Sequence, residues 1–343
     1  MGRKTKTNKV YSDELWNEVN PDNKELMDEF LEYLRSTDHS DSTIAQYRND
    51  LRMFFIWNLT SNHNKLFTDI TKRELLKMQN VHINDYEWSS NRYARYKSTL
   101  SSFSDYLEAF WDEEYPNFRN NIKKIPAPVK SPVREKSIFT EEELVAILDN
   151  LIADDKLEVA VYLALAMYSG RRKQELARFK MSYFRDETVV FGSLYKTDEQ
   201  VRTKGRGKNG KLLNLYVLKN KFDPYLDLWR KYREENGIES EWLLYNPNDP
   251  SSPVSVPTMD NWGVIINKYC DEKKPWYCHS MRHFMCSELG RAGLPPEVVR
   301  QLFGWSDITL VSVYDDRDMD DELGKYFDAD GIITQEKKKL SDL

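Results

Sequence analysis

The chain has 343 residues, of which 40% are hydrophobic and 31% are charged, and its formal net charge is −6. This composition excludes an intrinsically disordered chain, and the length favours two domains over one. No stretch approaches the roughly 20 apolar residues of a membrane span, and residues 1–9 are polar and basic, so we expect neither an anchor nor a signal peptide. Three cysteines, Cys270, Cys278 and Cys286, are an odd set that suits reduced thiols. These features predict a cytoplasmic protein without a membrane partner.

Changes in residue pattern divide the chain into five segments. The start lacks helical periodicity and carries several lysines, which predicts a flexible basic arm. A later stretch holds Pro126, Pro128 and Pro132 among basic residues, which is typical of an extended linker. The predicted segments are an arm (1–22), a helical domain (23–123), a linker (124–137), a second domain (138–318) and a tail (319–343). The tail is predicted to be acidic and helical.

Apolar residues at helical spacing predict two long helices in the first domain. One begins at Asp41, where Ser42 and Thr43 can cap it, and the other covers residues 89–111. Weaker helices are predicted at 24–35 and 71–78. The two long apolar faces are Ile44, Tyr47, Leu51, Phe54 and Phe55 on the first, and Leu100, Phe103, Leu107 and Phe110 on the second.

Basic side chains on these two helices are candidate DNA contacts. Arg48 and Arg52 fall outside the apolar stripe of the first helix. On the second helix, cations alternate with Tyr93 and Tyr96, a mixture that suits a DNA backbone, although a basic helix surface is also typical of plain solvent exposure. The candidates are Arg48, Arg52, Arg92, Arg95 and Lys97.

The second domain is predicted to be mainly helical with a small hairpin. Thr140 and Glu143 form a capping box, with Phe139 placed to pack on Leu144. Residues 157–168 are apolar on all sides, which predicts a buried central helix. Strands are predicted at 188–191, 200–203 and 212–218, the last two flanking a glycine-rich turn, and a helix is predicted to start at Pro295. The fold class is therefore mainly α with a small β-hairpin or sheet (α+β).

Two short segments of the second domain carry cationic and titratable side chains. Arg172 follows the predicted central helix, and an ion pair with Glu175 is its simplest explanation, because a buried guanidinium needs an anion. His279 and Arg282 are three residues apart, so that both can face one anionic group from the same side of a helix. Each segment alone is a weak motif.

Three further residues stand downstream of these two segments. Gly304 and Trp305 lie downstream of His279-x-x-Arg282, and Tyr314 stands nine residues after Trp305. This order resembles the tyrosine recombinase (phage integrase) family, which has an arginine near a glutamate, a hairpin lysine, His-x-x-Arg, a Gly-His or Gly-Trp step and then a tyrosine, in this order. Many members carry His where this chain has Trp305, whose indole N–H can still donate to a phosphate oxygen. The resemblance covers about residues 139–316.

The resemblance implies a helical core-binding domain followed by a catalytic domain, with these residues in defined roles. Tyr314 would attack DNA phosphorus, His279 would take its proton, and Arg172 and Arg282 would neutralise the phosphate. Trp305 would donate to the phosphate, and Glu175 would orient the arginines. Lys204 fits the general-acid position best, with Lys208 second and Lys211 third; Arg206, Lys208 and Lys211 are also candidate DNA contacts. No cofactor and no metal are implied.

Three other interpretations stay open from the sequence. Cys270, Cys278, His279, His283 and Cys286 include zinc-ligand types, but their spacing matches no usual zinc pattern. A DNA-binding regulator could keep this fold without exchanging strands. A type IB topoisomerase would share the phosphotyrosyl chemistry, and the tail after Tyr314, as a contact between protomers, favours the recombinase.

The expected partners are double-stranded DNA and further copies of the chain, as a tetramer on DNA, with accessory proteins left open. The negative net charge speaks against nucleic-acid binding. It is uneven, however: basic residues gather at 123–136 and 202–211, and acids at 315–322. A DNA-facing side can therefore be positive, and we expect the protein at the nucleoid.

Overall fold

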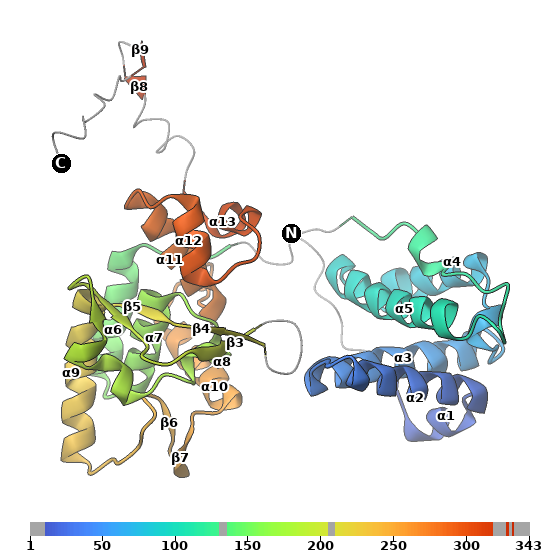
Figure 1. Ribbon diagram of the computed structural model, residues 1–343, viewed down its shortest axis with the longest axis horizontal. Helices are drawn as coiled ribbons and strands as arrows, with labels where there is room; N and C mark the ends of the chain where they lie inside the picture. The colour runs from blue at the N-terminus through green and yellow to red at the C-terminus, as the bar shows by residue number, and fades with distance from the viewer. Residues whose placement is uncertain (1–10, 130–135, 205–209, 318–326, 329–330, 333–343) are drawn as a thin grey trace. The chain divides into compact units, whose positions relative to one another are not determined.

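The computed structural model describes residues 11–129, 136–204, 210–317, 327–328 and 331–332 (Figure 1). The chain divides into two compact units between Glu135 and Lys136. Each unit has its own buried hydrophobic cluster, and the second unit carries a smaller cluster beside its main core. Residues 130–135 of the predicted linker and 205–209 of the predicted turn lie outside the described residues.

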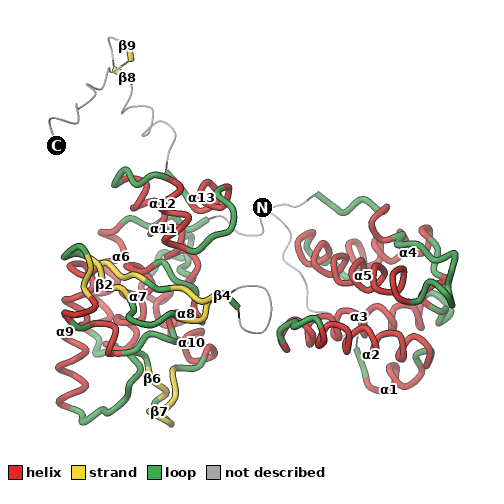
Figure 2. Tube along the Cα trace, viewed as in Figure 1, coloured by secondary structure: helices red, strands yellow, loops and turns green. Residues whose placement is uncertain are grey.

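The first unit is all-helical in the part that the structure describes (Figure 2). Helices α2, α3 and α5 pack on one another around an aromatic core that includes Phe30, Phe54 and Phe103. The predictions of two long helices and two shorter ones are confirmed. The helices are α1 (Asp13–Glu18), α2 (Pro21–Ser36), α3 (Asp41–Ser61), α4 (Lys72–Asn80) and α5 (Ser90–Phe110), with a π-helical segment at Val81–Asp85.

Three details of the first unit differ from the sequence prediction. Helix α1 lies within the predicted arm; it is six residues long and buries none of them, so it leaves no apolar period to detect. The cap of α3 is Ser40, whose hydroxyl accepts from the Thr43 backbone N–H at 3.3 Å, and not Ser42 or Thr43. Phe110 is 59% exposed and not part of the core.

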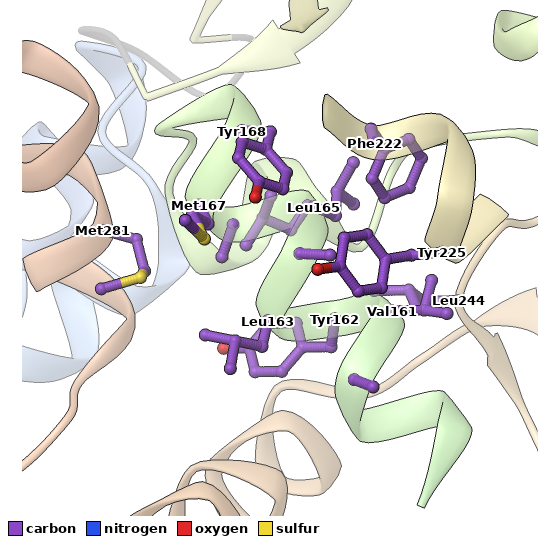
Figure 3. Close-up of a cluster of buried hydrophobic side chains, with 14 of the residues drawn as sticks. Val161, Tyr162, Leu163, Leu165, Met167, Tyr168, Phe222, Tyr225, Leu244 and Met281 are labelled. Carbon is purple, nitrogen blue, oxygen red and sulfur yellow. The ribbon is translucent and has the colours of Figure 1, made fainter. Parts of the chain in front are cut away.

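Helix α7 is the centre of the second unit. Every residue from Val159 to Ser169 is buried, and the helix packs against α6, α9, α11 and β5. Figure 3 shows its side chains among Phe222, Tyr225, Leu244 and Met281. The predicted central helix and the capping box at α6 are confirmed. The helices are α6 (Glu141–Ala153), α7 (Leu157–Ser169), α8 (Lys173–Leu176), α9 (Lys219–Glu235), α10 (Val256–Ile266), α11 (Cys278–Arg291), α12 (Pro296–Phe303) and α13 (Thr309–Tyr314).

Short antiparallel strands flank these helices. β1 (Val189–Val190), β2 (Leu194–Lys196) and β5 (Tyr216–Leu218) form one sheet in that order. β3 (Val201–Thr203) and β4 (Lys211–Leu213) form a separate hairpin with Thr203 opposite Lys211, which confirms the predicted hairpin. β6 (Tyr245–Asn246) pairs with β7 (Asp249–Pro253). The mainly α fold class is confirmed.

One strand prediction and one helix prediction were wrong. Residues 212–218 are not one strand, because Asn214 and Leu215 separate β4 from β5, and the Leu215 N–H turns to the Thr197 hydroxyl at 3.0 Å. In the tail, β8 (Phe327–Asp328) and β9 (Gly331–Ile332) pair as antiparallel strands where a helix was expected.

His82 of the first unit is fully buried in an aromatic box. The rings of Tyr86, Trp88 and Tyr96 lie 4.6–5.2 Å from its own, and its Nδ1 lies 2.8 Å from the Met78 carbonyl oxygen. Burial lowers the pKa of His82 from 6.5 to about 4, so the folded protein holds it neutral at pH 7.

We predict that His82→Phe keeps the box packed and removes one source of acid sensitivity. In the wild type, the unfolded chain binds this proton near pH 6.5 and the folded chain only near 4, so stability present above pH 6.5 is lost as the pH falls. Between about pH 7.5 and 5 the loss is roughly 2 kcal/mol. Urea unfolding at both pH values should show the variant losing about that much less; equal pH dependence would contradict this.

Candidate active site

Tyr314 and His279 meet in the second unit. Tyr314 ends α13, His279 lies in the first turn of α11, and the Tyr314 Oη is 2.9 Å from the His279 Nε2. The Tyr314 ring stacks on Trp305 with centroids 4.8 Å apart, and Trp305 stacks on Phe303 at 4.7 Å. The phenol is therefore held by a ring stack on one side and an imidazole at its oxygen.

Arg282 lies fully buried beneath this stack. Its guanidinium donates to the carbonyl oxygens of Gly170 at 3.0 Å and Phe303 at 3.3 Å. It also lies over the rings of Phe303, Trp305 and Tyr314, 4.6–5.6 Å from their centroids. Burial, together with the positive charges of Arg172 and Arg171, lowers the pKa of Arg282 below its ordinary value, but the group still carries a proton at neutral pH.

Gly170 permits the close packing beside Arg282. It ends α7 with φ at 61°, and a Cβ there would stand 2.7 Å from Phe303 and 2.9 Å from Met285. Gly304 plays a similar part at the end of α12, where φ is 68° and a Cβ would overlap Leu213. Only glycine fits both the conformation and the space at these two helix ends.

Arg172 and Glu175 form the ion pair that the sequence suggested. The Arg172 Nη1 and backbone N–H both lie 3.2 Å from the Glu175 carboxylate, which is buried, whereas the Arg172 side chain is 30% exposed. Sequence reasoning missed Arg171, which is buried and donates to the Leu302 carbonyl oxygen at 2.7 Å. Its position next to Arg172 was the only indication of it in the sequence. Arg171 ties the α7–α8 connection to α12, while Arg172 keeps an open face.

His279 is surrounded by positive charge. Dense packing around the ring, then His283, Arg282, Arg172 and Lys204, lower the pKa of His279 to about 4. The residue is nevertheless exposed to solvent. Its imidazole is therefore neutral at pH 7 and has a lone pair available for a proton.

The hairpin lysines occupy different places. Lys204 follows β3 directly and is exposed. It lies near enough to His279 for its positive charge to lower the pKa of that imidazole. Lys211 donates to the Gly304 carbonyl oxygen at 3.3 Å. Arg206 and Lys208 lie outside the described residues. Among the described residues, the structure thus brings Arg172, Glu175, Lys204, His279, Arg282, Trp305 and Tyr314 to one site.

Four of the five basic candidates of the first unit are engaged within that unit. Arg95 binds the buried Asp50 carboxylate through two hydrogen bonds of 2.8 and 3.1 Å. Arg92 lies 4.0 Å over the Trp88 ring, and Arg52 lies over Tyr11 and Trp16. Lys97 donates to the Ile125 carbonyl, and Arg48 is half-buried on α3. Tyr93 and Tyr96 point into the core and do not alternate with cations on the surface.

The cysteines do not gather into a metal site. Cys278 and Cys286 are buried and Cys270 is half-buried. Within the ranges that the structure describes, no three His, Cys, Asp or Glu side chains are arranged to hold a metal ion. The same ranges contain no helix with the length and apolar character needed to cross a bilayer.

Comparisons with known proteins agree with this site. The model of the phage integrase family matches residues 137–320. A recombinase-like protein of the SPbeta prophage, YomM of Bacillus subtilis, is 31% identical over 236 residues, which is 68% of each chain. The chain belongs to the phage integrase family. It is a tyrosine-type site-specific recombinase, and the regulator interpretation is not favoured.

More distant relatives extend the match along the chain. A tyrosine recombinase of Thermosipho africanus is 24% identical over 293 residues, covering 84% of this recombinase and 93% of the relative. The crystal structure of a lambda integrase tetramer bound to a Holliday junction aligns with a TM-score of 0.62 at 18% identity, over 87% of this chain and 79% of that one. The match in structure shows that the two proteins share a fold.

We predict that Gly170→Ala destabilises the recombinase more than Gly192→Ala does. Both glycines have positive φ, 61° and 69°, so each alanine costs roughly 1–2 kcal/mol of conformational energy. Only the alanine at 170 also meets Phe303 and Met285, which adds roughly 1–3 kcal/mol. Urea unfolding of the two variants measures the difference. An equal loss of unfolding free energy in the two variants would mean that the surroundings of Gly170 are not close-packed.

Proposed function

We propose that this recombinase cleaves and rejoins double-stranded DNA through attack of the Tyr314 oxygen on a backbone phosphorus. The observation that carries the proposal is the 2.9 Å contact between the Tyr314 Oη and the His279 Nε2, beside a buried arginine. A phenol with a pKa near 10 is a weak nucleophile at neutral pH unless a base takes its proton. A neutral His279 supplies that base.

The arginines supply positive charge for the phosphate. Arg282 uses two of its donors on carbonyl oxygens, and a guanidinium has five N–H groups, so others remain for a phosphate oxygen. Arg172 is partly exposed and offers its open side to the same group. Both charges would stabilise the five-coordinate transition state. Trp305 adds an indole N–H that is buried and, within the described residues, has no acceptor.

The step balances as one bond made and one broken. The Tyr314 oxygen bonds to phosphorus while the bond from phosphorus to the 5′ oxygen breaks, which leaves a 3′-phosphotyrosyl link. The phenol proton passes to His279, and the ammonium of Lys204 protonates the departing 5′ oxygen. Rejoining is the reverse step. The phosphotyrosyl bond conserves the energy of the original phosphodiester, so no nucleotide cofactor is needed.

We further propose that the protein acts as a tetramer on DNA, at the nucleoid of the cell. Support comes from the lambda integrase, which shares the fold and was solved as a tetramer on a Holliday junction. The tail, residues 319–343, is our candidate for the contact between protomers. Its described residues, β8 and β9, would offer strand edges for such a contact.

We expect Tyr314→Phe to abolish covalent attachment to DNA and leave DNA affinity nearly unchanged, because only the attacking oxygen is removed. A substrate nicked near the cleavage site should trap the wild type as a covalent complex and should not trap the variant. Attachment through Tyr326, or trapping of the Phe variant, would refute the assignment.

A second experiment identifies the general acid. Lys204→Ala should slow cleavage of normal DNA on the order of 100-fold or more, since the 5′ oxygen then leaves without a proton. On DNA with sulfur in place of that 5′ oxygen the variant should cleave at nearly the wild-type rate, because a thiolate leaves unaided. Lys211→Ala is the matched control and should treat the two substrates alike. The sulfur-selective effect at Lys208 instead would reassign the acid.

A further inference from the structure

The chain on either side of Tyr314 has a small hydrophobic face and is anchored mainly by polar contacts. Helix α13 has six residues, and Val311 is the one that it buries, while Val313 is 53% exposed. A helix this short is not stable by itself, because fixing the backbone of the first turn costs more free energy than its hydrogen bond contributes. The position of the phenol therefore depends on what holds the ends of the helix.

Asp316 is the main anchor after the nucleophile. Its side chain is only 5% exposed, and its carboxylate lies 2.8 Å from the Lys136 Nζ and 3.0 Å from the His283 Nδ1. Its backbone N–H donates to the Ser287 hydroxyl on α11 at 2.8 Å. Burial by itself would raise the pKa of Asp316, but His283 and Lys136 outweigh it and hold that pKa below its ordinary value.

Lys136 reaches both sides of Tyr314. Its ammonium binds Asp316, two residues after the nucleophile, and also donates to the Val313 carbonyl oxygen, one residue before it, at 3.3 Å. Lys136 is the first residue of the second unit and lies 180 positions from Asp316 in the sequence. One side chain thus spans the end of α13 from a distant part of the chain.

Arg317 completes the anchor on the next residues. Its guanidinium pairs with Asp315 at 2.7 Å and donates to the Gly290 carbonyl oxygen on α11 at 3.0 Å. A Cβ at Gly290 would stand 2.7 Å from the Arg317 Nε, so the glycine leaves room for this contact. His283, whose Nδ1 lies 3.0 Å from the Asp316 carboxylate, also packs against the Tyr314 ring with centroids 4.7 Å apart.

We propose that Lys136 and Asp316 form a latch that positions Tyr314 for attack in its own subunit. Both are positioning residues: they act on phosphorus only through the placement of the phenol. The inference rests on Tyr314 being the nucleophile. With the Lys136–Asp316 pair formed, the Tyr314 oxygen lies at His279. Without it, α13 keeps the packing of Val311 and Leu310 and the ring contacts of Tyr314, which do not fix the residues that follow the helix.

The first test compares covalent trapping with DNA binding. Lys136→Met should slow trapping on nicked DNA, at saturating DNA, on the order of 10- to 100-fold, because a displaced nucleophile loses its alignment. Equilibrium affinity should stay close to that of the wild type. Lys136→Arg should recover most of the rate, since an arginine can reach the same carboxylate. Lys221→Met, which removes a lysine of similar exposure from its ion pair with Glu141, is the matched control and should trap normally.

A double-mutant cycle and a measurement without DNA complete the test. Asp316→Asn should slow trapping to a similar degree, and the double variant should be no slower than either single variant, because the two residues act as one unit. In the free protein, backbone hydrogen exchange of residues 309–316 should speed up in both variants and stay normal in Lys221→Met.

The outcomes separate failure of the latch from failure of the proposed function. If the wild type itself never forms a covalent complex, the proposed function is refuted. If the wild type is trapped on DNA and Lys136→Met is trapped at the same rate, the proposed latch is refuted. A loss of affinity that excess DNA fully overcomes would make Lys136 a DNA contact, and additive effects in the double variant would also overturn the pairing.

Discussion

The buried guanidinium of Arg282 is the constraint around which the catalytic unit is arranged. A charge taken out of water is costly unless polar groups surround it. Here the acceptors, among the described residues, are two backbone carbonyl oxygens, from Gly170 and Phe303, and three aromatic rings lie nearby. None of these carries a full negative charge. Glu175 is the one carboxylate among the site residues named above and pairs with Arg172, so the site keeps an excess of positive charge that a phosphate is suited to balance.

Burial and the same positive charges together keep His279 neutral. Both lower the pKa of the imidazole, which keeps its lone pair free beside the Tyr314 oxygen. When a phosphodiester enters, its negative charge offsets the field of Arg282 and Arg172, and the affinity of His279 for a proton rises. With His279 as the proposed base, substrate binding would thus strengthen it at the moment when the phenol must lose its proton. This coupling would need no movement of the protein.

Local features of this fold were readable from the sequence, and contacts between distant segments were not. The helix at α7, the capping box at Thr140 and the β3–β4 hairpin depend on residues near one another, and each was predicted correctly. The order of Arg172, His279, Arg282 and Tyr314 in the sequence also predicted the site. Helix α1 was missed because it buries nothing, and 212–218 was read as one strand because a turn through buried Leu215 keeps the apolar pattern.

The same distinction explains why Lys136, His283 and Asp316 were not recognised as neighbours of the nucleophile. His283 was considered only as a zinc ligand, and Lys136 only as part of a basic linker. Their meeting depends on how α11 and the start of the second unit pack, which no local spacing reveals.

Net charge was misleading for a related reason. Some acidic side chains form ion pairs within the protein: buried Asp50 pairs with Arg95, and buried Glu175 pairs with Arg172. Each pairing fixes a guanidinium while leaving part of it exposed, 44% for Arg95 and 30% for Arg172. A carboxylate behind an arginine lowers the total charge but orients the donors that face outward. An acidic chain can therefore present ordered positive groups to DNA, and counting charges along the sequence cannot separate the supporting acids from the exposed ones.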